Sequence, residues 1–388
     1  MRILHTSDWH LGHMIYGYDR TEEQAAMLEA MCGIASEYKP DLFVLSGDVF
    51  HVSQPSAAVQ TMFTNAVSAL RHACPDMVIV ITAGNHDSAS RHEVFRTPWK
   101  TLGVHLTGNI SKENIEDHVI ELPGKGYVAA IPYCSDRNMP EGFYQSVLDH
   151  ISERNQDNLP VIMTAHTTVS GCDTTGHEGM NELVVGGIDG LALSDLGTGY
   201  DYLALGHIHR PQYISGGEGR VRYSGTPLPV SFDEAYGHSV TIVDIASHGD
   251  RPKITCVEVE NPCPMVTLPL EGFATWDEAK TLLSEFPAYI KAYIRLNVEV
   301  EDYLQPDAFT VAQSLTDGKA CRFCHINTRR KTVSGSVRKE LSIEEFKEES
   351  PVKIAERYAE DNDISFDEEL HMMFDEVLKI IEEESREE

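Results

Sequence analysis

Residues 42–48 read Leu-Phe-Val-Leu-Ser-Gly-Asp, an apolar run that ends in a glycine and a carboxylate. A short run of this kind, bounded by turn-forming residues, is typical of a buried parallel strand. Four other segments of the chain have the same arrangement. The run 3–4 precedes Asp8 and His10, and the run 78–81 precedes Asn85, His86 and Asp87. The run 161–163 precedes His166, and the run 203–205 precedes His207 and His209. Because ligands bind at the carboxyl ends of strands in open α/β sheets, we expect all five segments to deliver these side chains to one edge of one sheet.

The polar residues at these strand ends form a set that binds metals. Carboxylate and imidazole together suit Mn²⁺, Zn²⁺, iron or cobalt, whereas Mg²⁺ usually prefers oxygen ligands alone. No cysteine lies in the five segments, which argues against a structural zinc site. Gly47 allows a sharp turn that leaves the Asp48 carboxylate able to bridge two ions. Since two neighbouring cations activate water and stabilise the attacking and leaving oxygens in phosphoryl transfer, the pattern indicates a two-metal centre.

Each of these residues also has a purely structural explanation when it is considered alone. A single histidine after a strand is more often a hydrogen-bonded core residue than a ligand, and an isolated Asn-His-Asp has the composition of a turn. That explanation does not account for five strand ends that carry such residues in order along one chain. The joint occurrence therefore favours the metal centre.

Length and composition indicate a soluble globular protein without a membrane segment. The 388-residue chain has no apolar stretch of the ~18 residues that a membrane-spanning helix needs. A strand-like run follows the first methionine directly, without the features of a secretory signal peptide. We therefore expect a cytoplasmic protein whose 8 cysteines are reduced. Residues 321–325, Cys-Arg-Phe-Cys-His, match the pattern of haem attachment and leave a haem or a zinc half-site as disfavoured alternatives.

The charge of the chain is strongly acidic and unevenly placed. A formal net charge of −30 argues against tight, unassisted binding to DNA, because phosphate contacts favour Lys and Arg. Residues 340–388 hold 19 acidic against 5 basic side chains, whereas 319–339 contains seven basic residues and no acid. The basic stretch leaves room for a local contact surface on an otherwise acidic protein.

The pattern along the chain predicts three regions, 1–245, 246–339 and 340–388. The first alternates strand-like and helix-like segments, with helices expected at 21–38, 56–73 and 141–155, and Thr21 with Gln24 forms a capping-box pattern. After a turn-rich break at 246–252, the second region is expected to be a small α+β unit with strands at 264–270, 292–300 and 320–328 and a helix at 275–286. The third region has apolar residues at helical spacing on acidic helices. It is expected either to pack on its own domain or to dock on another protein, and its narrow apolar stripe favours docking.

The order Asp-x-His, Gly-Asp, Gly-Asn-His-Asp, His and Gly-His-x-His resembles the calcineurin-like metallophosphoesterase family. The resemblance implies an α/β fold, a layered β-sandwich flanked by helices, here followed by a small α+β capping domain and a helical C-terminal tail. It also implies roles for individual residues. Metal one would be held by Asp8, His10, Asp48 and His209, and metal two by Asp48, Asn85, His166 and His207. His86 would stabilise or protonate the leaving oxygen, a role that suits an imidazole at neutral pH, and Asp87 could orient its ring.

Four stretches resemble the SbcD family of DNA-repair nucleases, namely 6–12, 47–51 followed by Pro55 and Ser56, 206–211, and 223–234. This resemblance implies a homodimeric exonuclease and endonuclease that acts on DNA ends and hairpins with Mn²⁺. It further implies a partner, an SbcC-type coiled-coil ATPase, bound through 340–388, with 246–339 near the DNA path. His51 stands where many members carry an acid, and we assign it no ligand role.

Two other functions remain as alternatives. The chain could be a different phosphoesterase, such as a nucleotide phosphodiesterase or a phosphoprotein phosphatase, because these enzymes share every predicted metal ligand. It could also be a non-catalytic scaffold with a vestigial metal site that works through its tail. The extra region after residue 245 disfavours the first alternative, and the complete ligand set together with His86 disfavours the second.

Overall fold

A computed structural model describes residues 1–111, 113–135, 137–176, 190–331 and 352–353. The chain divides into two compact units, Met1–Arg330 and Lys331–Glu388. The predicted helical tail at 340–388 lies almost entirely outside the described residues and stays a prediction. None of the helices in the described ranges is long and apolar enough to cross a membrane.

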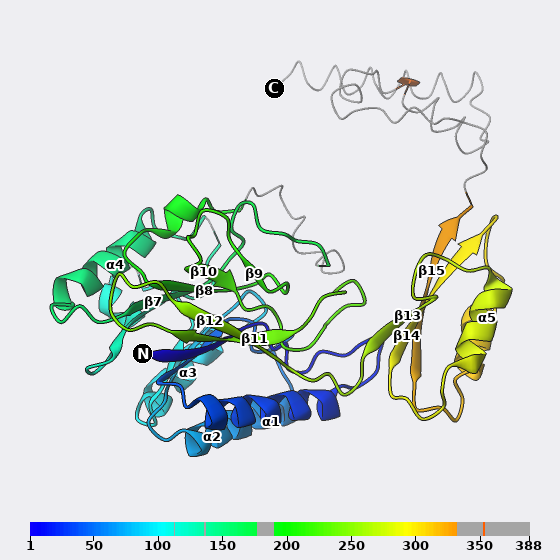
Figure 1. Ribbon diagram of the computed structural model, residues 1–388, viewed down its shortest axis with the longest axis horizontal. Coiled ribbons are helices and arrows are strands. Elements are labelled where there is room, and N and C mark those ends of the chain that lie inside the picture. The colour runs from blue at the N-terminus through cyan, green and yellow to red at the C-terminus, as the bar shows by residue number, and fades with distance from the viewer. Residues whose placement is uncertain (112, 136, 177–189, 332–351, 354–388) are drawn as a thin grey trace, which may run out of the picture. The chain divides into compact units, whose positions relative to one another are not determined.

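Two six-stranded sheets form the main body of the first unit (Figure 1). The first sheet has the order β12-β11-β1-β2-β3-β4. Its strands are β1 (Arg2–Thr6), β2 (Leu42–Ser46), β3 (Val78–Thr82), β4 (Val104–Thr107), β11 (Ser239–Asp244) and β12 (Lys253–Glu258). Strands β1 to β4 run parallel, whereas β11 and β12 extend the edge in antiparallel pairing. The pairing of β12 means that this sheet continues beyond residue 245, the predicted end of the first region.

The second sheet has the order β5-β6-β7-β8-β10-β9. Its strands are β5 (Val119–Leu122), β6 (Gly126–Ala130), β7 (Val161–His166), β8 (Tyr202–Gly206), β9 (Gln212–Tyr213) and β10 (Val221–Tyr223). The central strands β6, β7, β8 and β10 are parallel, and the two edge strands are antiparallel to their neighbours. Parallel strands in the middle of both sheets place several carboxyl ends side by side.

Three apolar layers hold the two sheets and their helices together. Successive residues of β2 illustrate the layering, because Leu42 and Val44 pack between the sheets while Phe43 and Leu45 pack under helices. Side chains alternate in this way along any strand, so a strand covered on both faces is apolar throughout. Helices α1 (Thr21–Tyr38) and α2 (Ala57–Ala73) contribute to the layer on the first sheet, and α4 (Phe143–Arg154) covers the second (Figure 1). The predicted layered α/β sandwich with flanking helices is confirmed.

The helices begin and end close to the predicted residues, but one predicted cap is wrong. Thr21 is the first residue of α1, and the N-cap position is Arg20, which makes no capping hydrogen bond through its side chain. Gln24 is buried and bonds the loop beside it, accepting from the Gly12 N–H at 3.0 Å and donating to the His10 carbonyl at 3.2 Å. The Gln24 side chain, which the local sequence pattern assigned to the helix cap, is thus occupied by a tertiary contact. A capping box is instead observed at a later helix, between Thr275 and Glu278.

A small three-stranded parallel sheet follows within the same unit. It consists of β13 (Met265–Leu268), β14 (Tyr293–Val300) and β15 (Arg322–Arg330), with helices α5 (Trp276–Glu285) and α6 (Ala308–Ser314). Helix α3 (Ala89–Lys100) and the short helices at Ile115–His118 and Leu193–Leu196 complete the described elements. Cys321 and Cys324, the pair in the haem-like pattern, are buried in two different apolar clusters and serve as core residues.

Candidate metal centre

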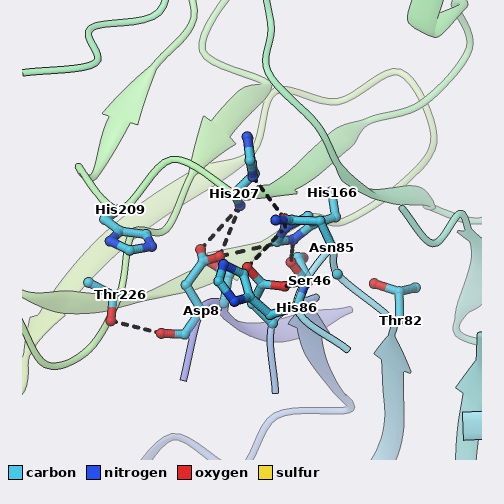
Figure 2. Close-up of polar contacts among 12 residues, drawn as sticks. Asp8, Ser46, Thr82, Asn85, His86, His166, His207, His209 and Thr226 are labelled. Atoms are coloured by element: carbon cyan, nitrogen blue, oxygen red, sulfur yellow. Dashed lines mark hydrogen bonds and ion pairs between the residues drawn. The ribbon is translucent and has the colours of Figure 1, made fainter. Parts of the chain in front are cut away.

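The predicted ligands come together at the carboxyl ends of five strands (Figure 2). They form two groups, Asp8 with His10 and His209, and Asp48 with His166 and His207. Within each group one ligand atom per residue lies within 4.8 Å of the others, and both groups are largely buried. These residues therefore meet in space as the sequence predicts, but their segments are divided between two sheets, whereas the strand-end pattern alone placed all five at one sheet. The first three segments follow β1, β2 and β3 of the first sheet, whereas in the second sheet His166 is the last residue of β7 and the last segment follows β8.

The backbone turns abruptly where these strands end. Asp8, His10, Asp48 and His207 all have positive φ angles, 54°, 43°, 49° and 97° respectively. Such conformations cost non-glycine residues about 1–3 kcal/mol each and are concentrated at functional sites. Gly47 also has a positive φ, and a Cβ there would overlap the His166 ring. The glycine before Asp48 is thus needed both for the turn and for the close approach of a histidine from the other sheet.

Asp48 lies between the two groups of ligands. Its Oδ2 is 3.8 Å from His10 Nε2 and 3.4 Å from His166 Nε2. Its other oxygen, Oδ1, accepts a hydrogen bond from the His86 backbone N–H at 3.0 Å. One carboxylate therefore faces ring nitrogens of both groups, which is the position required of a bridging ligand.

Asn85 joins the second group through its side-chain oxygen. Oδ1 is 3.0 Å from His166 Nε2 and 3.1 Å from His207 Nδ1 (Figure 2). The other ring nitrogen of His166 donates to the Ser46 carbonyl at 2.8 Å, which directs Nε2 toward Asn85 and Asp48. In the first group, His10 Nε2 and His209 Nε2 are only 3.1 Å apart. Nitrogen and oxygen atoms that are natural metal ligands thus point at one another in both groups, and the donor set fits a pair of divalent cations.

Burial and the charges of neighbouring side chains both shift pKa values in the site. Burial raises the pKa of Asp8 to about 7, with the neighbouring Asp48 charge acting in the same direction. Burial acts to lower the pKa of His166, but the carboxylates of Asp48 and Asp8 outweigh it and raise that pKa to about 9. The pKa of His10 is well below its ordinary value because the ring is buried among other histidines. Divalent cations between these groups would neutralise the carboxylates that burial disfavours, which is consistent with a metal site.

His86 and Asp87 lie beside the ligands and have different surroundings. His86 Nδ1 is 2.9 Å from the His51 carbonyl, and its ring is 4.9 Å from that of His10 between centroids. The Asp87 carboxylate accepts hydrogen bonds from the backbone N–H groups of Gly84, Val49 and Phe50, at 2.9, 3.1 and 3.0 Å. These contacts tie the loop after β3 to the loop after β2. The carbonyl of His51 is thus a partner that orients His86, and the predicted orienting role of Asp87 stays a prediction.

Three residues that the sequence prediction did not include support the ligands. Gln24 bonds the His10 loop from α1, and Ser46 orients His166 through its carbonyl. Glu234 is the third, because its carboxylate lies 2.8 Å from His209 Nδ1. Its one signal in the sequence is its place in the stretch 223–234 that resembles a nuclease family. No local pattern marks these residues, since each acts on a ligand that is distant in sequence.

Comparison with known proteins identifies the family. A family model described as calcineurin-like phosphoesterase matches residues 1–211, more than half of the chain. The chain belongs to the calcineurin-like phosphoesterase family. It is therefore a hydrolase of phosphoesters that binds divalent metal.

Relatives narrow the assignment to the SbcD group. The SbcD component of the SbcCD nuclease of Rhodobacter capsulatus is 33% identical over 306 residues, 72% of this chain and 74% of the relative. The protein of the same name from Bacillus subtilis is 33% identical over 330 residues, 78% of this chain and 80% of the relative. That from Escherichia coli K12 is 30% identical over 293 residues, 69% of this chain and 70% of the relative. The chain is thus a member of the SbcD nuclease family, and the predicted enzyme class is confirmed.

Proposed function

We propose that this chain is the nuclease component of a DNA-repair complex, which cleaves DNA phosphodiesters with two divalent metal ions. Exonuclease activity on double-stranded ends and endonuclease activity on hairpins or single strands are its proposed reactions. The proposal is supported most by the convergence of the seven predicted ligand side chains in two groups with Asp48 between them. The similarity to SbcCD nucleases over about three quarters of the chain supports DNA as the substrate.

Seven residues would hold the two ions. Asp8, His10, Asp48 and His209 are the proposed ligands of metal one, and Asp48, Asn85, His166 and His207 those of metal two. Four of the seven donate imidazole nitrogen, which favours Mn²⁺ over Mg²⁺ as the physiological ion. When bound, the ions would supply Lewis-acid activation of water and charge stabilisation at the reacting phosphate.

The protein's own side chains would position the phosphodiester and transfer one proton to its leaving oxygen. Because the His51 carbonyl accepts from Nδ1 of His86, the neutral ring carries its lone pair on Nε2. Protonated at Nε2, His86 would donate to the leaving oxygen of the cleaved strand. Asp87 would hold in place the loop that carries Asn85 and His86, because its carboxylate accepts hydrogen bonds from three backbone N–H groups.

The acidic chain would depend on a partner for tight DNA binding. We propose an SbcC-type coiled-coil ATPase as that partner, bound through 340–388, and a homodimeric nuclease in the cytoplasm. The basic side chains of 319–339 would belong to the capping region predicted at 246–339, although its first strand, β12, pairs with the first sheet of the nuclease region. Arg329 and Arg330 at the end of β15 are exposed and each pairs with one acid, Glu299 at 3.0 Å and Asp302 at 3.7 Å. If these arginines contact DNA phosphates, the affinity for DNA should fall as the salt concentration rises.

The proposed substrate is tested by comparing a DNA hairpin with a small phosphodiester, bis(p-nitrophenyl) phosphate. We expect Mn²⁺-dependent cleavage of the hairpin at a kcat/KM far above that for the small ester, and less activity with Mg²⁺. Adding an SbcC-type ATPase and ATP should increase cleavage of DNA but leave the small ester unaffected. Preference for the small ester under all conditions would contradict the nuclease assignment while leaving the metal centre intact.

His86→Ala is expected to reduce hairpin cleavage about 10²–10⁴-fold, the usual contribution of a general acid. Binding of Mn²⁺ should be unchanged, because His86 is not one of the proposed ligands. Cleavage kinetics and calorimetric titration with Mn²⁺ measure the two effects separately. His72→Ala, at an exposed position on α2, is the matched control and should retain full activity. Undiminished cleavage by the His86 variant would remove this residue from the mechanism.

A further inference from the structure

Glu234 is a buried acid whose carboxylate contacts a proposed metal ligand. Its side chain and that of His209 are each 1% exposed, and Oε1 lies 2.8 Å from His209 Nδ1. The other oxygen, Oε2, accepts from the Val230 backbone N–H at 3.3 Å. Burial raises the pKa of this carboxyl, whereas the Val230 N–H and the buried Arg20 guanidinium act in the opposite direction. The contacts of both carboxyl oxygens give Glu234 a fixed position beside His209.

The contact with Nδ1 determines how His209 faces the site. A neutral imidazole carries one hydrogen, and an ionised Glu234 carboxylate, which can only accept, would place that hydrogen on Nδ1. Nε2 then carries the lone pair, and it is this atom that lies 3.1 Å from His10 Nε2 in the first ligand group. Histidine ligands of metals commonly donate their second ring nitrogen to a carboxylate, which fixes the ring and increases its basicity.

The turn that carries Glu234 is itself bound to the metal-site loops. Thr226 donates through its hydroxyl to the Asp8 carbonyl at 2.8 Å, and its backbone N–H donates to the His209 carbonyl at 3.1 Å (Figure 2). The adjacent Asp233 makes a separate contact, to the Arg295 guanidinium at 2.6 Å. The two neighbouring acids thus face different groups. Glu234 also lies beyond residue 211, where the match to the general phosphoesterase family ends.

We propose that Glu234 is a positioning residue for metal one, which acts through His209 by holding its ring with Nε2 toward the ion. This inference rests on the proposed function, because it requires the two-metal centre. Its effect is confined to one of the two ions, since His166 and His207 of the second group are oriented by other contacts. Loss of such an outer partner typically weakens metal binding about 10–100-fold.

The test measures Mn²⁺ binding to the full chain in two ways. Calorimetry gives the number of ions and their affinities, and electron paramagnetic resonance detects the signal of the Mn²⁺ pair. The unaltered protein should bind two ions. Glu234→Ala should weaken one ion about 10–100-fold, leave the other unchanged and abolish the paired signal. Asp233→Asn is the matched control, because it alters the neighbouring acid without touching His209, and it should bind both ions normally. A merely structural role would weaken both sites or neither.

A double-mutant cycle with His209→Ala shows whether Glu234 acts through the histidine. If it does, adding Glu234→Ala to the His209 variant should cause no further loss at metal one. Additive losses, or full affinity in Glu234→Ala, would overturn the proposal. If Glu234→Ala does not fold when metal-free, Glu234→Gln decides: selective weakening of one ion supports the proposal and unchanged affinity overturns it. Failure of the unaltered protein to bind Mn²⁺ would instead refute the proposed function.

Discussion

Replacing Asp48 by Ala should abolish phosphodiester cleavage. Its carboxylate is the group that faces ring nitrogens from both ligand sets, so the change removes a proposed ligand from each ion at once. Metal ions contribute several kcal/mol of transition-state stabilisation, and about 4 kcal/mol corresponds to a thousandfold in rate. We therefore expect at least about a thousandfold loss of kcat/KM on a DNA hairpin, together with loss of the second Mn²⁺ in calorimetry.

Asp48→Asn separates the charge from the shape of the side chain. The amide keeps the size of the carboxylate and one oxygen, but it cannot supply the negative charge that a bridge between two cations needs. It should be nearly as inactive as the alanine variant. Asp76→Asn, at an exposed position before β3, serves as the matched control and should behave as the unaltered protein does. Substantial activity in either Asp48 variant would refute the bridging role.

Gly206→Ala should damage both the fold and the metal site. A Cβ at this position would overlap the Ser46 carbonyl oxygen, since the two atoms would be much closer than the 3.0 Å below which real Cβ atoms are essentially never found. It would also lie 2.9 Å from His166 Nδ1. The first contact is with backbone, so relief requires β8 and β2 to move apart. Overpacking of this kind typically costs about 1–3 kcal/mol, and we expect the upper end or more because neither strand can yield alone. Urea denaturation of the metal-free protein measures the loss.

The same substitution should also weaken binding of Mn²⁺. The Ser46 carbonyl that a Cβ would displace is the group that accepts from His166 Nδ1 and directs Nε2 into the site. Gly237→Ala is the control, since no atom lies within 4 Å of a Cβ built there, and it should change stability by less than about 0.5 kcal/mol. A Gly206 variant as stable and as metal-competent as this control would show that the two sheets can separate locally without cost.

The predictions that succeeded rest on local properties of the chain. Helices expected at 21–38, 56–73 and 141–155 are observed at Thr21–Tyr38, Ala57–Ala73 and Phe143–Arg154. Their bounds follow from apolar spacing and from the turn residues that flank them, which act over a few positions. The strand ends were predictable for the same reason. Each apolar run ends where a glycine or polar residue follows.

The predictions that failed depend on contacts between distant residues. The runs at 42–45 and 161–163 look alike in sequence because both strands are buried on both faces, yet they belong to different sheets. Nothing in either run specifies its neighbour, since strand pairing is decided by packing of the whole sandwich. Gln24 shows the same effect at one residue. Its spacing from Thr21 predicted a helix cap, but its side chain instead accepts a hydrogen bond from Gly12, twelve residues earlier in the chain.

The sequence by itself determined the family chemistry and the proposed metal ligands, because residue types and their order at the strand ends are local properties of the chain. Only the tertiary structure decided how that set is held. It divides the five strand ends between two sheets, places Asp48 between two groups of ligands, and brings Glu234 to His209 from a separate turn. The physical reason is that ligand identity is a property of single residues. Orientation depends on hydrogen bonds and close approaches between segments that only the complete fold brings together.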